Sequence, residues 1–108
     1  MTRTTLGNLE HQVLLAALRL KDQAYSVSVV LEIEARTGRE VAQAAVFIAL
    51  RRLEAKGFLR SRLEETDDAG HLRRYFALTP AGLAKLREMR RALKGLWQGL
   101  AAALDGAG

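Results

Sequence analysis

The side chains best placed to bind another molecule lie in residues 41–59, VAQAAVFIALRRLEAKGFL. Val46, Leu50 and Leu53 recur at helical spacing and predict a buried stripe, while Gly57 is placed to end the helix. The other face is small and basic with an aromatic flank; it comprises Ala44, Phe47, Ile48, Arg51, Arg52 and Ala55. A helix with one buried stripe and a low basic face can lie in a DNA major groove. Ordinary cores also contain such helices, so the neighbouring segments must decide.

Reactive side chains elsewhere give no support for catalysis. The chain has no cysteine, and its two histidines, His11 and His71, are far apart in sequence, so neither a metal site nor a nucleophilic dyad is expected. His11 is interpreted as a helix-surface or interface residue. A glycine-rich phosphate-binding loop does not occur in the sequence. We therefore expect a protein that is not an enzyme and that has no cofactor or metal.

Composition bounds the class of protein. The 108 residues suffice for one compact domain, and a hydrophobic fraction of 49% is ample for its core. The formal charge of +5 is a moderate basic excess, found in nucleic-acid binders and in many other proteins. No apolar run approaches the roughly 18 residues of a membrane span, the start MTRTTLGN is no signal peptide, and the lack of cysteine fits a reducing cytosol. We expect a cytoplasmic protein without membrane contact.

Two helices are predicted before residue 41. The first covers residues 6–20 with Thr5 as N-cap, and it is apolar on more than one face, so it is either central or shared with a second subunit. The second covers residues 26–36 and ends at Thr37-Gly38, where glycine supplies a left-handed backbone. So tight a glycine-containing turn before Val41 is typical of a helix-turn-helix motif.

After residue 57 the apolar period changes from helical to alternating. Residues 58–65 and 72–78 alternate on either side of the turn TDDAGH and predict a two-stranded hairpin, which makes the motif a winged helix. The acidic residues near this turn are interpreted as solubilising. Arg73 and Arg74 alternate in direction, so at most one of them faces DNA from a given strand face.

The C-terminal segment begins with Thr79-Pro80, an N-cap followed by proline at the first helical position. The helix is predicted to continue to about Leu104, with apolar residues near heptad spacing and a basic remaining face. Little of its own core is left for such a helix to cover, so we expect a homodimer. The predicted interface comprises Leu6, Leu9, Val13, Leu86, Met89, Leu93, Leu96, Trp97 and Leu100.

Taken in order, these segments resemble the PadR family of bacterial transcriptional regulators. The resemblance runs from LGNLEHQVLLAAL through LEIEARTGREV and AVFIALRRLEAKGFLRSRLEE to RRYFALTPAGLAKL, over about residues 6–88. It implies a dimeric winged-helix repressor whose first and last helices form the dimer interface. In many such proteins a small molecule releases the DNA.

The sequence departs from the family at Ala42, Ala44, Phe47 and His71, where serine, glycine, tyrosine and arginine are common. Taken together, the changes remove polar contacts without removing the fold, and the serine alone would contribute an N-cap worth about 1 kcal/mol. DNA binding is therefore expected to be weaker, or more dependent on phosphate contacts and DNA shape, than is typical of the family.

The predicted DNA-binding residues are Gln43, Ala44, Phe47, Ile48, Arg51, Arg52, His71, Arg73 and Arg74. Gln43 is the polar side chain best placed to read a base edge. Arg51 and Arg52 either contact DNA or form a solvated helix face, DNA being favoured for Arg51 alone. Phe47 either contacts a thymine methyl group or sugar, or packs against the wing. Trp97 either anchors the dimer or forms a platform for a small aromatic or hydrophobic effector.

We therefore predict a mainly α fold with a two-stranded β wing. Residues 1–78 would form a winged helix-turn-helix DNA-binding domain, and residues 79–108 a dimerisation helix with a frayed tail. The predicted function is a homodimeric, sequence-specific repressor that binds double-stranded DNA at a pseudo-palindromic operator. The alternative is a winged-helix protein-interaction module without operator recognition. The argument for this alternative is that the outer face of the recognition helix (residues 42–57) is poor in base-reading groups.

Overall fold

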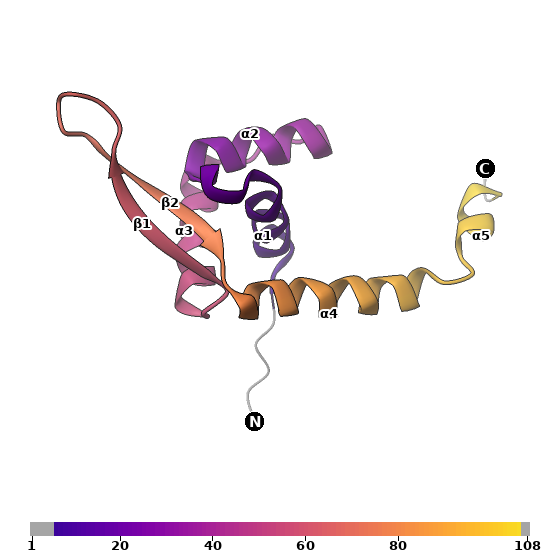
Figure 1. The fold of residues 1–108 in the computed structure, drawn as a ribbon. Helices are drawn as coiled ribbons and strands as arrows, with labels where there is room; N and C mark the ends of the chain where they lie inside the picture. Colours follow the sequence, from indigo (N-terminus) through magenta and orange to yellow (C-terminus); the bar gives the residue numbers. More distant parts are fainter. Residues whose placement is uncertain (1–5, 107–108) are drawn as a thin grey trace.

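The order of the elements in the computed structural model, which describes residues 6–106, is that of a winged helix. The elements are α1 (Asn8–Leu20), a 3-10 turn η1 (Lys21–Gln23), α2 (Ser26–Thr37), α3 (Gln43–Ala55), β1 (Leu59–Glu65), β2 (Leu72–Leu78), α4 (Pro80–Trp97) and α5 (Ala101–Asp105). The first three helices pack together, the β1–β2 hairpin projects to one side, and α4 leads away to the other with α5 at its end (Figure 1). The predicted fold class is confirmed. The predicted N-cap of α1, Thr5, lies outside the described residues.

α1 and α3 form the centre of the core. Val46, Leu50 and Leu53 of α3 are fully buried, as their spacing predicts, and they share one apolar cluster with Val13 and Leu14 of α1. Burial of an aliphatic side chain of this size contributes about 1.5–3 kcal/mol to folding. The buried stripe therefore fixes the rotation of α3 about its axis.

Two residues assigned to the dimer interface belong to this core instead. Val13 is fully buried within the single chain, and Leu86 is only 7% exposed. The large apolar side chains that α1 leaves exposed are Leu15 and Leu18, with 46% and 43% of their surface accessible. α1 packs against both α2 and α3. The sequence of a helix that is apolar on several faces does not reveal which face is turned inward.

The turn between α2 and α3 has the predicted helix-turn-helix geometry. Gly38 follows α2 with a φ of +70°, the left-handed conformation expected at this position. The backbone N–H of Val41 donates to the Glu34 carboxylate, with 3.0 Å between N and Oε2, and the Val41 side chain packs against the core. α3 begins after Ala42 without a side-chain cap, as the sequence predicts.

The hairpin is attached to the helical body at its foot. β1 and β2 pair antiparallel over residues 59–65 and 72–78. Phe76 is fully buried, and its N–H donates to the Ala24 carbonyl with 2.8 Å between N and O. Ala24 thereby forms an isolated bridge with β2. Alternation within the hairpin did not predict this bridge, because its partner lies about fifty residues earlier along the chain.

α4 is capped as predicted but is shorter than predicted. The Thr79 hydroxyl accepts from the Gly82 N–H, with 3.1 Å between O and N, and proline is the first helical residue. The helix ends at Trp97 instead of continuing to about Leu104, and Gly99 has a φ of +80° before the short α5. Glycine adopts this conformation without a side-chain clash, and the regular apolar spacing concealed the break. Within residues 6–106 no helix is long and apolar enough to cross a membrane.

The packing at the start of α4 gives a first prediction. A Cβ atom at Gly82 would lie 2.2 Å from the backbone carbonyl oxygen of Phe58, whereas one at Gly95 would meet nothing within 4 Å. Gly82→Ala should lower the free energy of unfolding by about 1–3 kcal/mol through overpacking. Gly95→Ala, in the same helix, should raise it by up to about 1 kcal/mol. Urea denaturation measures both changes, and similar effects in the two variants would contradict the packing described.

Candidate nucleic-acid interface

The outer face of α3 is exposed and contains every residue predicted for it. These residues are Gln43, Ala44, Phe47, Ile48, Arg51 and Arg52. Phe47 and Ile48 are 42% and 51% exposed, although the stripe on the opposite side of the helix is fully buried. Apolar and guanidinium groups side by side suit a DNA major groove, which presents thymine methyl groups and base acceptors together.

Two polar side chains of this face contact neighbours within the chain. Gln43 Nε2 donates to Ser26 Oγ at 3.3 Å, where the N-termini of α2 and α3 meet. Arg51 Nη1 lies 3.5 Å from Glu54 Oε1, one turn further along α3. Exposed contacts of this kind are weak in water. The Gln43 side chain can therefore exchange Ser26 for another ligand at low cost, and the five N–H donors of the Arg51 guanidinium allow it to face Glu54 and another ligand at once.

The part of the wing that contains Ser61, Arg74 and Phe76, here called its foot, joins the same surface. Arg74 Nη1 donates to Ser61 Oγ at 2.9 Å across the hairpin, and the Ser61 hydroxyl donates to the Glu54 carboxylate. Arg51 and Arg74 thus lie at the two ends of one series of contacts that runs through Glu54 and Ser61. Neither Glu54 nor Ser61 was predicted as a site residue. The alternation along the two strands could have indicated Ser61 and Arg74 as neighbours. It places both side chains on the inward face of their strands, with Phe76.

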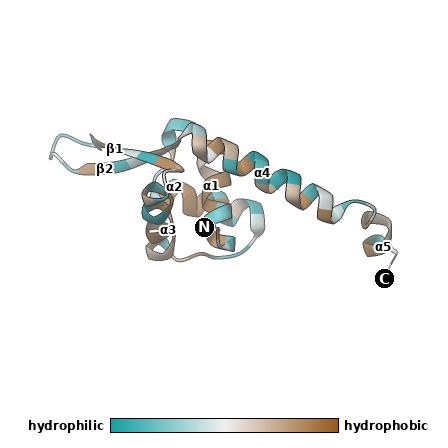
Figure 2. Cartoon of the chain, turned by 90° about the horizontal axis from the view of Figure 1, so that it is seen from below, coloured by the Kyte–Doolittle hydropathy of each residue, from teal (hydrophilic) through white to brown (hydrophobic). Residues whose placement is uncertain are grey.

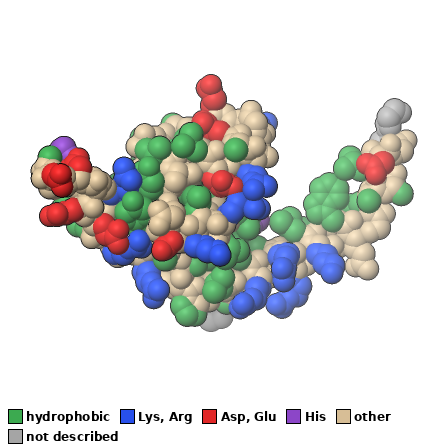
Figure 3. Space-filling model, turned by 45° about the horizontal axis from the view of Figure 1, so that its top comes forward, with side chains coloured by type: hydrophobic (Ala, Val, Ile, Leu, Met, Phe, Trp, Pro, Cys, Tyr) green, Lys and Arg blue, Asp and Glu red, His purple; other side chains and the backbone are tan. Residues whose placement is uncertain are grey.

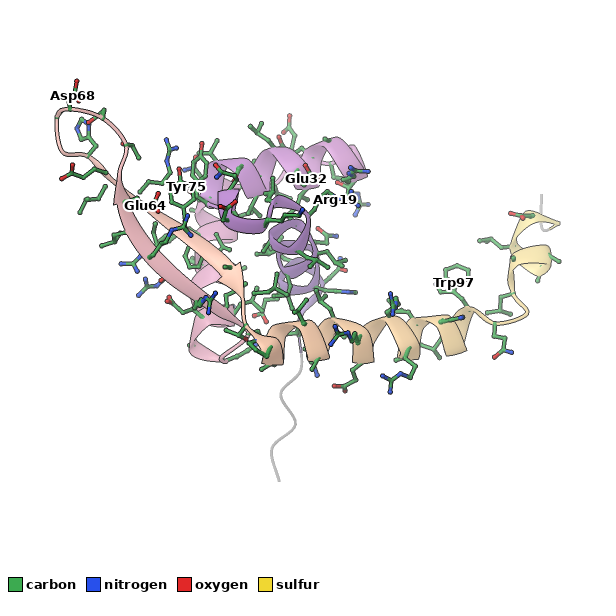
Figure 4. All side chains as sticks on the ribbon, in the orientation of Figure 1. Arg19, Glu32, Glu64, Asp68, Tyr75 and Trp97 are labelled. Atoms are coloured by element: carbon green, nitrogen blue, oxygen red, sulfur yellow. The ribbon has the colours of Figure 1, made fainter. Side chains whose placement is uncertain are left out.

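Arg73 contacts two tyrosine side chains of its own chain, and its assignment to the DNA-binding set stays a prediction. Its guanidinium carbon lies 4.0 Å from the centroid of the Tyr25 ring, and its Nη1 donates to Tyr75 Oη at 3.2 Å. The two tyrosine rings meet edge to face with centroids 5.5 Å apart, and Tyr75 lies on the hairpin (Figure 4). Arg62 adds a further cation–π contact 4.9 Å from the Tyr75 centroid. Arg73 therefore connects the wing to Tyr25, the residue before α2.

The tip of the wing is acidic. Glu64, Glu65, Asp67 and Asp68 lie around the turn, and Figure 3 shows them as a red cluster beside the histidine of the turn. His71 Nδ1 lies 2.7 Å from Asp67 Oδ2, and this hydrogen bond lowers the pKa of the Asp67 carboxyl. Carboxylates at this tip would repel phosphate groups. The basic foot of the wing is therefore better suited to DNA than its tip.

A second surface combines α1 with α4. A pocket of 620 Å³ lies between these helices, with His11, Leu15, Leu18, Leu93 and Trp97 among its lining residues. Trp97 is 54% exposed and stands at the end of α4 (Figure 4). Burial lowers the pKa of His11 below its ordinary value. Sequence reasoning missed Leu15 and Leu18, because their exposure depends on how α1 packs.

The predicted interface residues of α4 differ in exposure along the helix. Met89 is half-buried, whereas Leu93, Leu96 and Leu100 are exposed. Figure 2 shows hydrophobic and hydrophilic residues alternating along α4 as it leaves the body. Leu9 of α1 and Leu6, just before α1, are partly buried against the chain's own core.

A helix-turn-helix whose second helix exposes a low basic face, followed by an antiparallel wing, defines a winged-helix DNA-binding protein. The family described as "Transcriptional regulator PadR-like family" matches residues 14–88. The chain therefore belongs to the PadR-like family of transcriptional regulators, as the sequence resemblance predicts.

Individual relatives agree with this assignment. A transcriptional regulator of Mycobacterium tuberculosis is 44% identical over 61 residues, which cover 56% of this chain and 55% of the relative, so the match spans about half of that protein. A PadR family regulator from Eggerthella lenta has 28% identity and a TM-score of 0.68, covering 85% of this chain and 80% of that one. A PadR family regulator from Clostridium difficile has a TM-score of 0.75 over 91% of this chain and 99% of that one; its 20% identity shows the fold alone.

Proposed function

We propose that the protein is a homodimeric repressor that binds a pseudo-palindromic operator and is released by a small hydrophobic effector. The observation that carries this proposal is the meeting of the exposed face of α3 with the basic foot of the wing, through Arg51 and Arg74. Each subunit would place α3 in a major groove, with half-sites about one helical turn apart. Residues 1–78 would bind DNA, and residues 79–108 would hold the two subunits together.

The proposed DNA contacts divide by chemistry. Gln43 and Arg51 carry the donors and acceptors that can read base edges, and Phe47 and Ile48 offer apolar surface to thymine methyl groups. Ala44, with its small side chain, lets the helix approach closely. Phosphate contacts fall to Arg52 on α3 and Arg74 at the foot of the wing, with His71 at the acidic tip a lesser contributor.

The dimer is proposed from the exposed leucines of two helices. Leu15 and Leu18 of α1 face the same pocket as Leu93 of α4, and Leu96 further along α4 is 72% exposed. Apolar side chains gathered in this way mark a contact with another protein surface. α4 projects away from the body (Figure 1), so its outer half is positioned to pack on a second copy.

The effector site is proposed at Trp97. Its indole lines an open pocket with leucines of α1 and α4. A large aromatic ring on an apolar wall is a suitable platform for a flat hydrophobic molecule. Because the same leucines are proposed to hold the dimer, a ligand bound there would alter the spacing of the two DNA-facing helices.

DNA binding is tested with Arg51. The protein should shift DNA from upstream of its own gene at low salt, with an affinity that falls steeply as salt rises. Arg51→Ala should weaken binding by about 1–3 kcal/mol, roughly 5- to 150-fold, if Arg51 reads a base. Arg19→Ala, at an exposed arginine of α1 away from α3, is the control and should change affinity little. Absence of any shift at low salt would contradict the repressor and favour a protein-interaction module.

Dimerisation is tested by light scattering. At micromolar concentration the protein should have about twice the 11.9 kDa mass of one chain. Leu96→Asp should shift the population toward monomers, because it places a carboxylate in the proposed apolar interface. Leu72→Asp makes the same change at an exposed leucine of the wing and should leave the dimer intact. A monomeric wild-type protein would rule the dimer out.

The effector site is tested by fluorescence, since Trp97 is the only tryptophan of the chain. Planar aromatic compounds should quench its emission at concentrations that also release DNA in the gel-shift assay. Indifference of the emission to a broad panel of such compounds would leave Trp97 with a structural role alone.

A further inference from the structure

We infer that Glu54 is a positioning residue that joins the recognition helix and the wing into one rigid DNA-binding unit. The inference rests on the proposed DNA-binding function and adds to it a residue that sets specificity without contacting DNA. Glu54 lies in the last turn of α3, where the helix is about to pass into β1. It is therefore close to both elements that the proposal brings to DNA.

The geometry uses both oxygens of the Glu54 carboxylate. Oε1 lies 3.5 Å from Arg51 Nη1 on α3, and Oε2 accepts from the Ser61 hydroxyl on β1. Ser61 Oγ in turn accepts from Arg74 Nη1 of β2 at 2.9 Å. One carboxylate thus orients the guanidinium group of Arg51 directly and that of Arg74 through Ser61.

A carboxylate at this place has an electrostatic disadvantage for DNA binding. The Glu54 side chain is 29% exposed beside two arginines that are proposed to face DNA, so its charge opposes the phosphates. A half-exposed ion pair also adds little to the stability of the fold. The contribution of Glu54 is geometric, because the planar fork of an arginine reads a base or phosphate only when it is correctly aimed.

These opposing effects predict a distinctive result for Glu54→Gln. Loss of one negative charge should raise the affinity for random-sequence DNA, or leave it unchanged. The ratio of operator affinity to random-sequence affinity should fall about tenfold, because the arginines are no longer held in register. A residue with a merely structural role would lower both affinities together.

Ser61→Ala separates geometry from charge. It cuts the link between Glu54 and Arg74 without changing the charge of the protein. Because the phosphate contact proposed for Arg74 would fix the register of the protein on the operator, the affinity ratio should fall while random-sequence affinity stays constant. Glu88→Gln is the matched charge control. Glu88 is an exposed carboxylate of α4 that lies 3.7 Å from Lys85, and its neutralisation should leave the ratio unchanged.

The experiment begins by selecting bound duplexes from a random pool with the full-length protein. Dissociation constants for the selected duplex and for a scrambled duplex are then measured by fluorescence anisotropy for the wild type and the three variants, with thermal unfolding as the check on folding. Wild-type ratios in both Glu54→Gln and Ser61→Ala would overturn the role of Glu54 while leaving the repressor intact. A wild-type protein that selects no sequence would instead overturn the proposed function, and this role with it.

Discussion

The rest of the structure depends on the packing of one stripe of α3 against α1. Val46, Leu50 and Leu53 are fully buried, and an α-helix has only one face opposite any given stripe. Burying these three side chains therefore exposes the proposed DNA face as its complement, including Phe47 and Arg51. The hydrophobic core sets the orientation of the polar surface, so a change in the core at this stripe would also re-aim the side chains on the outside.

The junction at Phe58 transmits this orientation to the wing and to α4. Its carbonyl accepts from the Thr79 N–H with 3.1 Å between O and N, while the Thr79 hydroxyl donates to the Gly57 carbonyl at 2.6 Å. The same Phe58 carbonyl lies where a side chain on Gly82 would need to be. Phe58 is therefore the point where the end of α3, both strands and the start of α4 meet. The direction of α4 follows from that of α3.

Features that depend on neighbours in sequence could be predicted, and features that depend on distant neighbours could not. The left-handed Gly38, the Thr79 cap and the alternation of the wing are local, and the structure confirms each. The contact of Arg73 with Tyr25 spans almost fifty residues, and the series through Glu54 and Ser61 needs the angle between α3 and β1. The break at Gly99 was concealed by leucines that continue the helical spacing across it.

The bridge between Ala24 and Phe76 has a consequence for the behaviour of the molecule in concentrated solution. It caps part of the outer edge of β2, while β1 in residues 6–106 pairs on one side alone. An unpaired strand edge is a template on which a second molecule can add a strand and begin to aggregate. β1 is seven residues long and carries Arg60, Arg62 and Glu64 along one face. These charges oppose such pairing, so the wing can stand out in solvent without joining molecules edge to edge.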